Sequence, residues 1–301
     1  METIKGRKHD VKLKGALCII LSGVIFGLMP IAAKAIYANG GNSQLLTFLR
    51  YLFSLPLLWL LRRREKQAEK LRRDQIRRLL LVASGYVVTP LLLFLSYNYI
   101  PSGLSTTLHF VYPVLVLAGC AAFYRERITR LQALCCALCV VGVVCFYTPG
   151  GGISLFGVAV ALLSGVFYAF YIICLAKCGL QTELSAFRLA FWLQAVGALA
   201  AGVMCLFTGS LWVDMTPLGW GLCVLFSLVT LGGSLCFQVG TGLCGPQYAS
   251  LLSTFEPLTS VVVGVAILHE ALTLRSGVGI VCVLASVVLL ALGKGEAAEA
   301  A

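Results

Sequence analysis

The sequence predicts an all-α membrane protein in which ten transmembrane helices form two inverted five-helix repeats. Three observations predict this fold: the composition, ten apolar stretches and an internal repeat. Hydrophobic residues make up 59% of the 301 positions and charged residues 12%, with a mean hydropathy of +0.95. A soluble domain carries about 25% charged residues, so most of this chain avoids water.

The apolar stretches are each close to the roughly 20 residues that a helix needs to cross a bilayer. They cover residues 14–37, 44–61, 78–99, 102–124, 131–147, 154–176, 185–207, 217–240, 247–268 and 275–293. The first is preceded by lysines, as a signal peptide would be, but its apolar run exceeds the roughly 7–15 residues of a signal sequence. We therefore expect a retained helix, with residues 1–13 and 294–301 as tails.

The chain repeats itself at a constant interval. The dipeptides Tyr112-Pro113 and Glu256-Pro257 lie 144 positions apart, and the same interval separates Glu126 from Glu270. Upstream, the Leu-Ser-Gly-Val segment of residues 21–24 recurs 142 positions later. A drift of two positions over such a length indicates two copies of one ancestral unit. Duplicated apolar units are typical of transporters.

The distribution of basic residues predicts the orientation. With the N-terminus inside, only Arg275 of the 23 lysines and arginines falls on an external segment, while Lys34 and Arg50 lie within spans. Cytoplasmic loops carry such an excess, so we expect a multi-pass protein of the plasma (inner) membrane with both termini cytoplasmic. Five spans is an odd number, so the second repeat must be inverted. The basic segment 62–78 and its counterpart 208–216, which has no basic residue, agree with this.

The cysteine content suggests a metal-binding protein and the net charge suggests a nucleic-acid-binding protein. The positions of the residues argue against both classes. Most of the 13 cysteines lie inside apolar stretches, where they are predicted to pack as small polarizable residues. Cys136 and Cys139 have a metal-like spacing, but neither a second such pair nor a nearby histidine completes a site. We predict no metal and no cofactor. The basic residues that give the net charge of +11 flank the predicted membrane helices. This position favours anionic lipid over nucleic acid as their partner.

Several motifs mark the two halves, and the glycine and the proline–glutamate pair recur in both. Each half opens with a glycine and ends with a proline that is followed thirteen positions later by a glutamate; proline and a Phe-Leu-Arg segment mark the first two spans. These are Gly15, Gly157, Pro30, residues 48–50, and the pairs Pro113…Glu126 and Pro257…Glu270. With ten spans, this pattern resembles the drug/metabolite transporter (DMT) superfamily, and within it the EamA-type transporters.

The resemblance implies two EamA-like repeats, at 14–147 and 154–293, and a secondary transporter of small metabolites, often an exporter of amino acids. It also implies an inner cavity between spans 1–4 and 6–9, with spans 5 and 10 at the periphery. It does not identify the substrate, because one fold serves many substrates.

Three charges lie well within the spans: Lys34, Arg50 and Glu256. Each costs about 2.5–3.5 kcal/mol in a bilayer, so it is expected to face a cavity or a partner. The fork of Arg50 suits a substrate carboxylate, and the alternative is an ion pair with Glu256. Glu256, near the middle of span 9, could bind a substrate amine, accept a coupling proton or balance Arg50. Lys34 is either a site residue or a side chain that snorkels to the interface.

Polar and aromatic side chains complete the predicted site. His109 lies three residues before Tyr112 on the same helical face and could carry a coupling proton; the alternative is a neutral histidine bonded to a neighbouring helix. The other candidate cavity residues are Tyr168, Trp192, Gln194 and Asn98, each of which could instead belong to a packed or hydrogen-bonded core.

Four prolines are predicted hinges because proline removes a helical hydrogen bond. They are Pro30, Pro90, Pro113 and Pro257. In contrast, Glu126 and Glu270 are predicted to be structural. They close spans at opposite membrane faces, have arginine neighbours such as Arg275, and precede Thr129 or Thr273 as N-caps of the next helix.

These predictions combine into a secondary transporter that moves a small polar metabolite by alternating access. The deep charges sum to +1, which favours an amino acid or a related zwitterion or anion as substrate. The resemblance implies export. One rival is a flippase of lipid carriers or lipophilic compounds, which would need a lateral opening. Another is a membrane-embedded enzyme, but His9, His109 and His269 are dispersed and form no catalytic cluster. The chain has no nucleotide-binding loop, so a gradient, for instance of protons, would drive transport, by a monomer or a homodimer.

Overall fold

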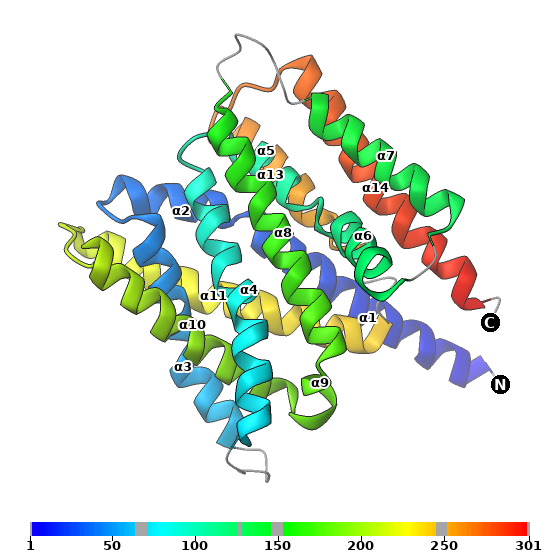
Figure 1. Cartoon of the computed structure of the whole chain (residues 1–301), viewed down its shortest axis with the longest axis horizontal. Coiled ribbons are helices and arrows are strands. Elements are labelled where there is room, and N and C mark those ends of the chain that lie inside the picture. The colour runs from blue at the N-terminus through cyan, green and yellow to red at the C-terminus, as the bar shows by residue number, and fades with distance from the viewer. Residues whose placement is uncertain (1, 64–70, 126–127, 146–152, 245–251, 300–301) are drawn as a thin grey trace.

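A computed structural model describes residues 2–63, 71–125, 128–145, 153–244 and 252–299. The described chain is all-helical, as predicted, and contains no strand (Figure 1). Its helices are α1 (Glu2–Gly27), α2 (Met29–Ala38), α3 (Ser43–Arg63), α4 (Arg73–Ser96), α5 (Ser102–His109), α6 (Tyr112–Tyr124), α7 (Arg130–Cys145), α8 (Leu155–Lys177), α9 (Leu180–Glu183), α10 (Ala186–Thr208), α11 (Pro217–Cys244), α13 (Phe255–Ala266) and α14 (Leu274–Glu299). Helix extends into both predicted tails, beginning at Glu2 and continuing to Glu299.

Seven segments of the described chain are long and apolar enough to cross a membrane. Three further apolar helices, Arg130–Cys145, Phe255–Ala266 and Leu274–Leu289, are shorter than that criterion and occupy predicted spans 5, 9 and 10. The helices therefore fall where the apolar stretches predict them, while the count of ten full spans depends on these three.

Several predicted spans are interrupted near a proline. Span 1 breaks at Leu28 between α1 and α2, and Pro30 is the second residue of α2. Span 4 breaks at Phe110 and Val111, directly before α6. Pro90 differs, because it lies inside α4, which stays helical from Arg73 to Ser96. Neighbouring groups can satisfy the freed backbone groups at such breaks.

The helix contacts are related by exchange of the two halves. The pair α1 with α11 corresponds to α8 with α4, while α3 pairs with its counterpart α10 and α7 with α14. Two helix groups result. The α1 group contains α1, α2, α3, α11 and α13, and the α8 group contains α4, α5, α6, α8 and α10. They meet along two main seams, α3 with α10 and α5 with α13, and by a smaller contact between α3 and α4.

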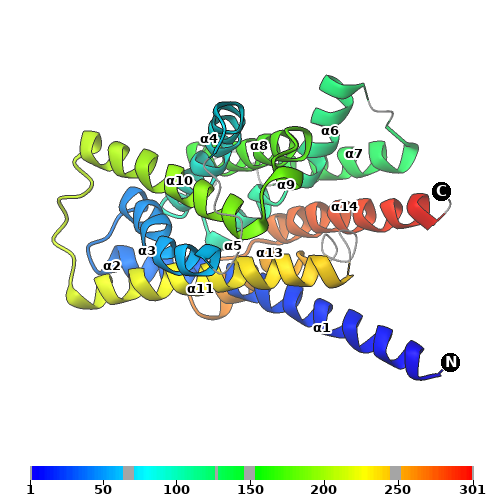
Figure 2. The ribbon, with the colours of Figure 1, turned by 90° about the horizontal axis from the view of Figure 1, so that it is seen from below.

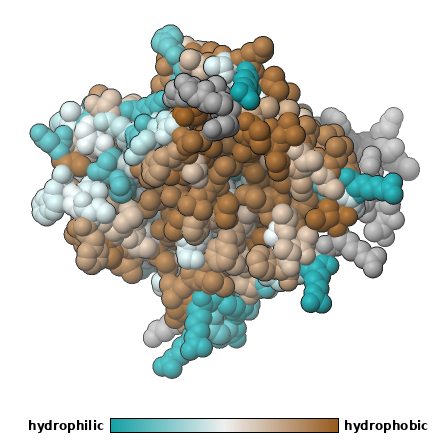
Figure 3. Space-filling view, turned by 45° about the horizontal axis from the view of Figure 1, so that its top comes forward, coloured by the Kyte–Doolittle hydropathy of each residue, from teal (hydrophilic) through white to brown (hydrophobic). Residues whose placement is uncertain are grey.

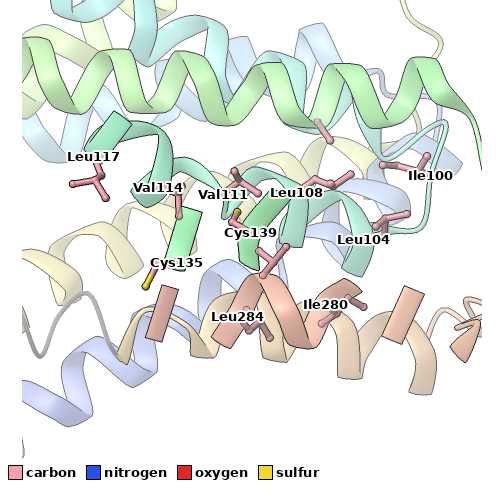
Figure 4. Close-up of a cluster of buried hydrophobic side chains, with 12 residues drawn as sticks. Ile100, Leu104, Leu108, Val111, Val114, Leu117, Cys135, Cys139, Ile280 and Leu284 are labelled. Atoms are coloured by element: carbon pink, nitrogen blue, oxygen red, sulfur yellow. The ribbon is translucent and has the colours of Figure 1, made fainter. Parts of the chain in front are cut away.

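The helices α7 and α14 lie side by side at one edge of the molecule (Figures 1 and 2). A hydrophobic cluster joins them to α5 and α6 (Figure 4). Cys135 and Cys139 point into this cluster and are 0% and 2% exposed, beside Ile280 and Leu284. The prediction that these cysteines act as packing residues is therefore confirmed.

The surface matches a protein that lies in lipid. Figure 3 shows hydrophobic residues over the middle of one face and hydrophilic residues mainly at its margins. Large apolar side chains such as Phe207, Trp212 and Leu274 are 86% to 88% exposed. The two chain ends lie at the same end of the molecule (Figure 2).

Candidate functional site

The second helix of each broken span begins at a motif residue or directly before one. Tyr112 is the first residue of α6, and Glu256 lies in the first turn of α13, directly after a turn at Ser253 and Thr254. Glu256, predicted near the middle of span 9, thus lies where α13 begins within that span. At a helix N-terminus the unpaired N–H groups and the helix dipole favour negative charge, by about 0.3–1 kcal/mol at exposed sites. The first N–H groups at both breaks are largely bonded within the turn, as Val114 N is to the Val111 carbonyl oxygen and Glu256 N to that of Ser253. The helix dipole is therefore the part of this effect that remains at the motif residues.

The repeated Leu-Ser-Gly-Val segments pack against these breaks. A methyl group added at Gly23 would lie 3.1 Å from the Phe255 Cβ atom, and one at Gly165 would lie 2.9 Å from the carbonyl oxygen of His109. Each segment therefore contacts the broken span of the other repeat. Glycine permits this close helix approach, as the small-x-x-x-small spacing of Gly23 and Gly27 predicts.

Arg50 and Glu256 carry opposite charges and form no direct bond with each other. The Arg50 guanidinium carbon lies 5.8 Å from the centre of the Phe94 ring, and its charge acts on the Glu256 carboxylate. None of the ion pairs among the described residues joins the two. Both are half-buried. The alternative of a direct Arg50–Glu256 ion pair is thus not realised, and both groups retain bonding capacity.

A row of tyrosine rings lies beside these charges. Neighbouring ring centres are 4.6 to 5.7 Å apart, a contact distance for aromatic pairs. The row, which we call the tyrosine array, comprises Tyr51, Tyr86, Tyr171, Tyr168 and Tyr112. It crosses α3, α4, α8 and α6.

The array and the two charges interact. The Glu256 charge acts on the hydroxyls of Tyr112 and Tyr168, and the Arg50 charge acts on Tyr86 and Tyr168. The site therefore combines one anion, one cation and several hydroxyl groups in the interior of the helix bundle.

Sequence reasoning found Tyr112 and Tyr168 but missed Tyr51, Tyr86 and Tyr171. The spacing of Tyr168 and Tyr171, three residues apart on one helix face, is a signal that could have indicated the third. Tyr51 and Tyr86 come from other helices, and the Tyr51 hydroxyl donates to the Tyr86 carbonyl oxygen at 3.0 Å. No local spacing connects such residues.

His109 is buried and bonded to a neighbouring helix. Its Nδ1 atom lies 2.9 Å from the Ser164 hydroxyl of α8, and its ring contacts those of Tyr112 and Tyr168. The bond to a neighbouring helix that one of the two alternatives requires is present, and the role in carrying a coupling proton stays a prediction.

The remaining candidates are divided. Trp192 and Gln194 lie in α10, where the indole Nε1 and the amide Oε1 are buried without a hydrogen-bond partner among the described residues. Such atoms cost free energy unless water or a ligand satisfies them. Asn98 instead lies in the exposed turn between α4 and α5, so the structure does not bring it to the tyrosine array.

Lys34 forms an ion pair with Glu270. Its ammonium lies 2.5 Å from Glu270 Oε1, and that carboxylate also accepts hydrogen bonds from the backbone and hydroxyl of Ser102 at 2.9 and 2.8 Å. The expected partner Arg275 forms no ion pair within the described residues. The hydrogen bonds from Ser102 explain why Glu270 points toward α5. Glu126, its repeat counterpart, lies outside the described residues.

Both predicted N-caps are confirmed. The hydroxyl of Thr129 accepts from the backbone of Gln132 at 3.3 Å, and that of Thr273 accepts from Ser276 at 3.1 Å. Each begins the last helix of its repeat. A cap of this kind contributes about 0.5–2 kcal/mol to helix stability.

An apolar cavity of about 270 Å³ lies beside Glu270 rather than at the tyrosine array. Its wall includes Gly103 and Leu104 of α5, Val261 and Val265 of α13, and Ile280 of α14. This cavity carries few polar groups, so it lacks the convergent bonding groups of a site for a polar metabolite.

A second ionic cluster joins α4 to α9 at the other end of the molecule from α2 (Figure 1). Glu183 accepts from Arg78 at 2.8 Å, from Gln75 at 2.9 Å and from Arg72 at 3.0 Å. The hydrogen bonds from Arg78 and then Gln75 lower the pKa of Glu183 to about 2. This cluster lies within the α8 group and its connecting helix.

Metal ligands do not gather anywhere in the described part of the chain, where no group of three His, Cys, Asp or Glu residues could hold an ion. The site residues described above bear carboxylate, guanidinium, hydroxyl and amide groups, which suit a polar organic ligand.

Comparisons with known proteins give one consistent result. A sequence profile of the EamA-like transporter family matches residues 13–148 and again residues 155–292. The chain is 26% identical over 300 residues to the uncharacterized inner membrane transporter YicL of Salmonella typhimurium, covering 96% of this chain and 98% of that protein. It is 25% identical over 319 residues to the uncharacterized transporter sll1319 of Synechocystis, covering 93% and 94%.

A protein of known crystal structure has a similar fold. It superposes with a TM-score of 0.64 at 14% sequence identity, and the match covers 93% of this chain and 97% of that one. At this identity the likeness concerns the fold alone.

Proposed function

Because the chain belongs to the EamA-like transporter family and is a multi-pass membrane transporter, we propose that it carries a small zwitterionic metabolite, such as an amino acid or a close relative. We propose export by alternating access, driven by a gradient. The separation of Arg50 from Glu256 carries this proposal.

Two opposite charges in the interior that do not neutralise each other can each bind one end of a zwitterion. The guanidinium of Arg50 suits a carboxylate, and the carboxylate of Glu256 suits an ammonium group. Lys34 is bonded to Glu270, so Arg50 and Glu256 remain as one cation and one anion beside the tyrosine array, while a further cation, Arg188, is buried in the first turn of α10. This favours a zwitterion over the anion that the sequence count of +1 allows.

Both helix breaks support the same proposal. The helices α6 and α13 begin at these breaks, and the dipole of each places its positive end there, as in transporters whose broken helices bind anionic substrate groups. Breaks next to Pro30, Pro113 and Pro257 are also the places where helix packing could change between two states.

The exchange relation between helix contacts supports two structural repeats. The distribution of basic residues supports the inversion of the second repeat and cytoplasmic termini. A tag-accessibility experiment tests this orientation. Tags in segments 62–78 and 208–216 should become accessible from opposite sides of the membrane. Access from the same side would exclude the inverted arrangement.

Transport itself is tested in proteoliposomes. The purified protein should show counterflow of at least one labelled amino acid or related zwitterion. The ligand can first be sought by thermal stabilisation, because a ligand that binds the folded state raises its melting temperature. Arg50→Ala should abolish counterflow, whereas Ser84→Ala, at an exposed position on α4, should not. If Arg50→Ala transported every candidate as fast as the parent, the proposed site would be wrong.

A further inference from the structure

The carboxylate of Glu270 bonds to both helix groups. From α2, the Lys34 ammonium lies 2.5 Å from this carboxylate. From α5, the carboxylate accepts hydrogen bonds from the Ser102 backbone N–H at 2.9 Å, the Ser102 hydroxyl at 2.8 Å and the Gly103 backbone N–H at 3.4 Å. Glu270 itself lies in the turn after α13. One side chain therefore connects three elements, and the bonds to α5 cross the seam between the α1 group and the α8 group.

The backbone before Glu270 is held in an unusual conformation. His269 has a φ of 53°, in the left-handed region that is unfavourable for residues with a Cβ atom. Arg125, its counterpart 144 positions earlier, has a φ of 55°. Both repeats thus have the same unfavourable backbone conformation at the position directly before the motif glutamate. Strain of this kind persists where the surrounding structure requires it.

Other contacts close the same seam near Glu270. The Ser260 hydroxyl of α13 donates to Thr106 Oγ1 of α5 at 3.0 Å. At the far end, where α3 meets α10, the Arg62 guanidinium lies over the Phe191 ring at 4.4 Å, a contact of about 0.5–1 kcal/mol at an exposed site. Hydrogen bonds to charged groups are stronger, at about 1.5–3 kcal/mol. The hydrogen bonds of a charged group across the seam therefore lie at the Glu270 end, whereas α3 and α10 are joined by close packing, as where Gly197 approaches the Tyr51 ring.

Glu270 is ionised under ordinary conditions. Burial by itself would raise the pKa of this carboxyl, but hydrogen bonds from Lys34 and Ser102 outweigh burial and hold that pKa below its usual range. The apolar cavity beside Glu270 leaves room for the turn to move without displacing packed side chains.

We infer that Glu270 and Lys34 form a latch that holds the α5 end of the seam closed, and that release of this latch opens that end during transport. The inference rests on the proposed alternating-access function. It assigns Glu270 a role in the conformational cycle that differs from substrate binding. Glu126 and Lys177 are the sequence counterparts, 144 and 143 positions away, but Glu126 lies outside the described residues, so the latch is defined at one end only.

Hydrogen–deuterium exchange of the full chain in lipid nanodiscs tests the latch without any substrate. In Glu270→Gln, amide exchange in peptides covering 29–38 and 102–109 should become on the order of tenfold faster, because the end opens more often. Peptides covering 55–63 and 186–192, at the opposite end, should exchange more slowly, because that end closes when the α5 end opens. Glu183→Gln is the matched control: it also removes a carboxylate that accepts several hydrogen bonds, but within one helix group.

The two-ended response separates a latch from a simple helix cap. If Glu270→Gln speeds exchange only in 102–105 and leaves 186–192 unchanged, Glu270 merely caps α5 and the inference is overturned. An equal response of Glu183→Gln at both ends would also overturn it. If Glu270→Gln does not fold, Lys34→Met, which leaves the cap on α5 intact, must give the same two-ended pattern, and Lys34→Arg must restore the parent pattern.

The result is independent of the transport assay. A latch response in a protein that moves no zwitterion would leave the latch in place and refute the proposed substrate. Counterflow of a zwitterion together with no exchange response would support the substrate and refute the latch.

Discussion

The two broken spans are the same backbone feature with different chemistry. Each breaks before an X-Pro dipeptide and packs against the Leu-Ser-Gly-Val segment of the other repeat. In the first, X is Tyr112, and His109 is bonded to Ser164. In the second, X is Glu256, and Ser22 occupies the position that corresponds to Ser164.

This difference shows what a duplication retains and what it can change. Backbone geometry depends on proline and on close glycine contacts, and both halves retain these. Side chains at the breaks are free to diverge, because they face the interior rather than determine the helix packing. The result is one charged and one neutral half of a single site, which suits a substrate with unlike ends.

The largest expected effect concerns the two X residues. Glu256→Gln should reduce zwitterion transport roughly 10- to 100-fold, because it removes a charge-assisted contact of about 1.5–3 kcal/mol. Tyr112→Phe removes at most a neutral hydrogen bond and should cost less than about tenfold. Concentration-dependent counterflow of both variants checks this order. Equal losses would mean that the two halves contribute alike.

The glycine contacts give the next effect. An added methyl group at Gly27 would lie 2.5 Å from Thr259 Cβ and 2.6 Å from the Glu256 carbonyl oxygen. Gly27→Ala should therefore destabilise the protein by about 1–3 kcal/mol through overpacking. Gly165→Ala should act in the same direction at the other break. Gly232→Ala is the control, because nothing lies within 4 Å of its added methyl group. Thermal unfolding in detergent measures all three, and a neutral Gly27→Ala would contradict the close packing.

The paired serines should respond unequally. Ser164→Ala leaves the buried His109 Nδ1 without its partner and should cost about 1–3 kcal/mol. Ser22 is fully buried, and its hydroxyl has no partner among the described residues, so Ser22→Ala should be neutral or slightly stabilising. The same unfolding measurement compares them. A larger loss for Ser22→Ala would show that its hydroxyl binds water or another group.

The smallest effect concerns acid stability at the α9 end. The folded-state pKa of Glu183 is lowered to about 2 by Arg78 and Gln75, so its contribution is full above the ordinary carboxyl pKa and is lost as the pH falls toward 2. The cluster is largely exposed, so the expected change is small. Melting temperatures at pH 7 and pH 3 should differ less in Glu183→Gln than in the parent. An unchanged difference would show that this cluster does not contribute.

Periodic and local features of the site were predictable. The prolines identified three of the helix breaks, and Thr129 and Thr273 were identified as caps from their position before a helix. The doubled interval indicated that Tyr112 and Glu256 are equivalent. Pro90 was predicted as a hinge, but α4 continues through it as a helix. A proline inside a helix is tolerated where neighbours satisfy the freed groups, and the sequence does not report those neighbours.

The sequence by itself determined the membrane class, the repeat and the family, because hydropathy, charge distribution and motif spacing are properties of the chain in order. Only the tertiary structure decided which side chains meet. Lys34 and Glu270 are 236 positions apart, and the tyrosine array draws on four helices. Such contacts depend on how helices rotate and approach each other, and in lipid that choice is made by close packing and hydrogen bonds rather than by hydropathy.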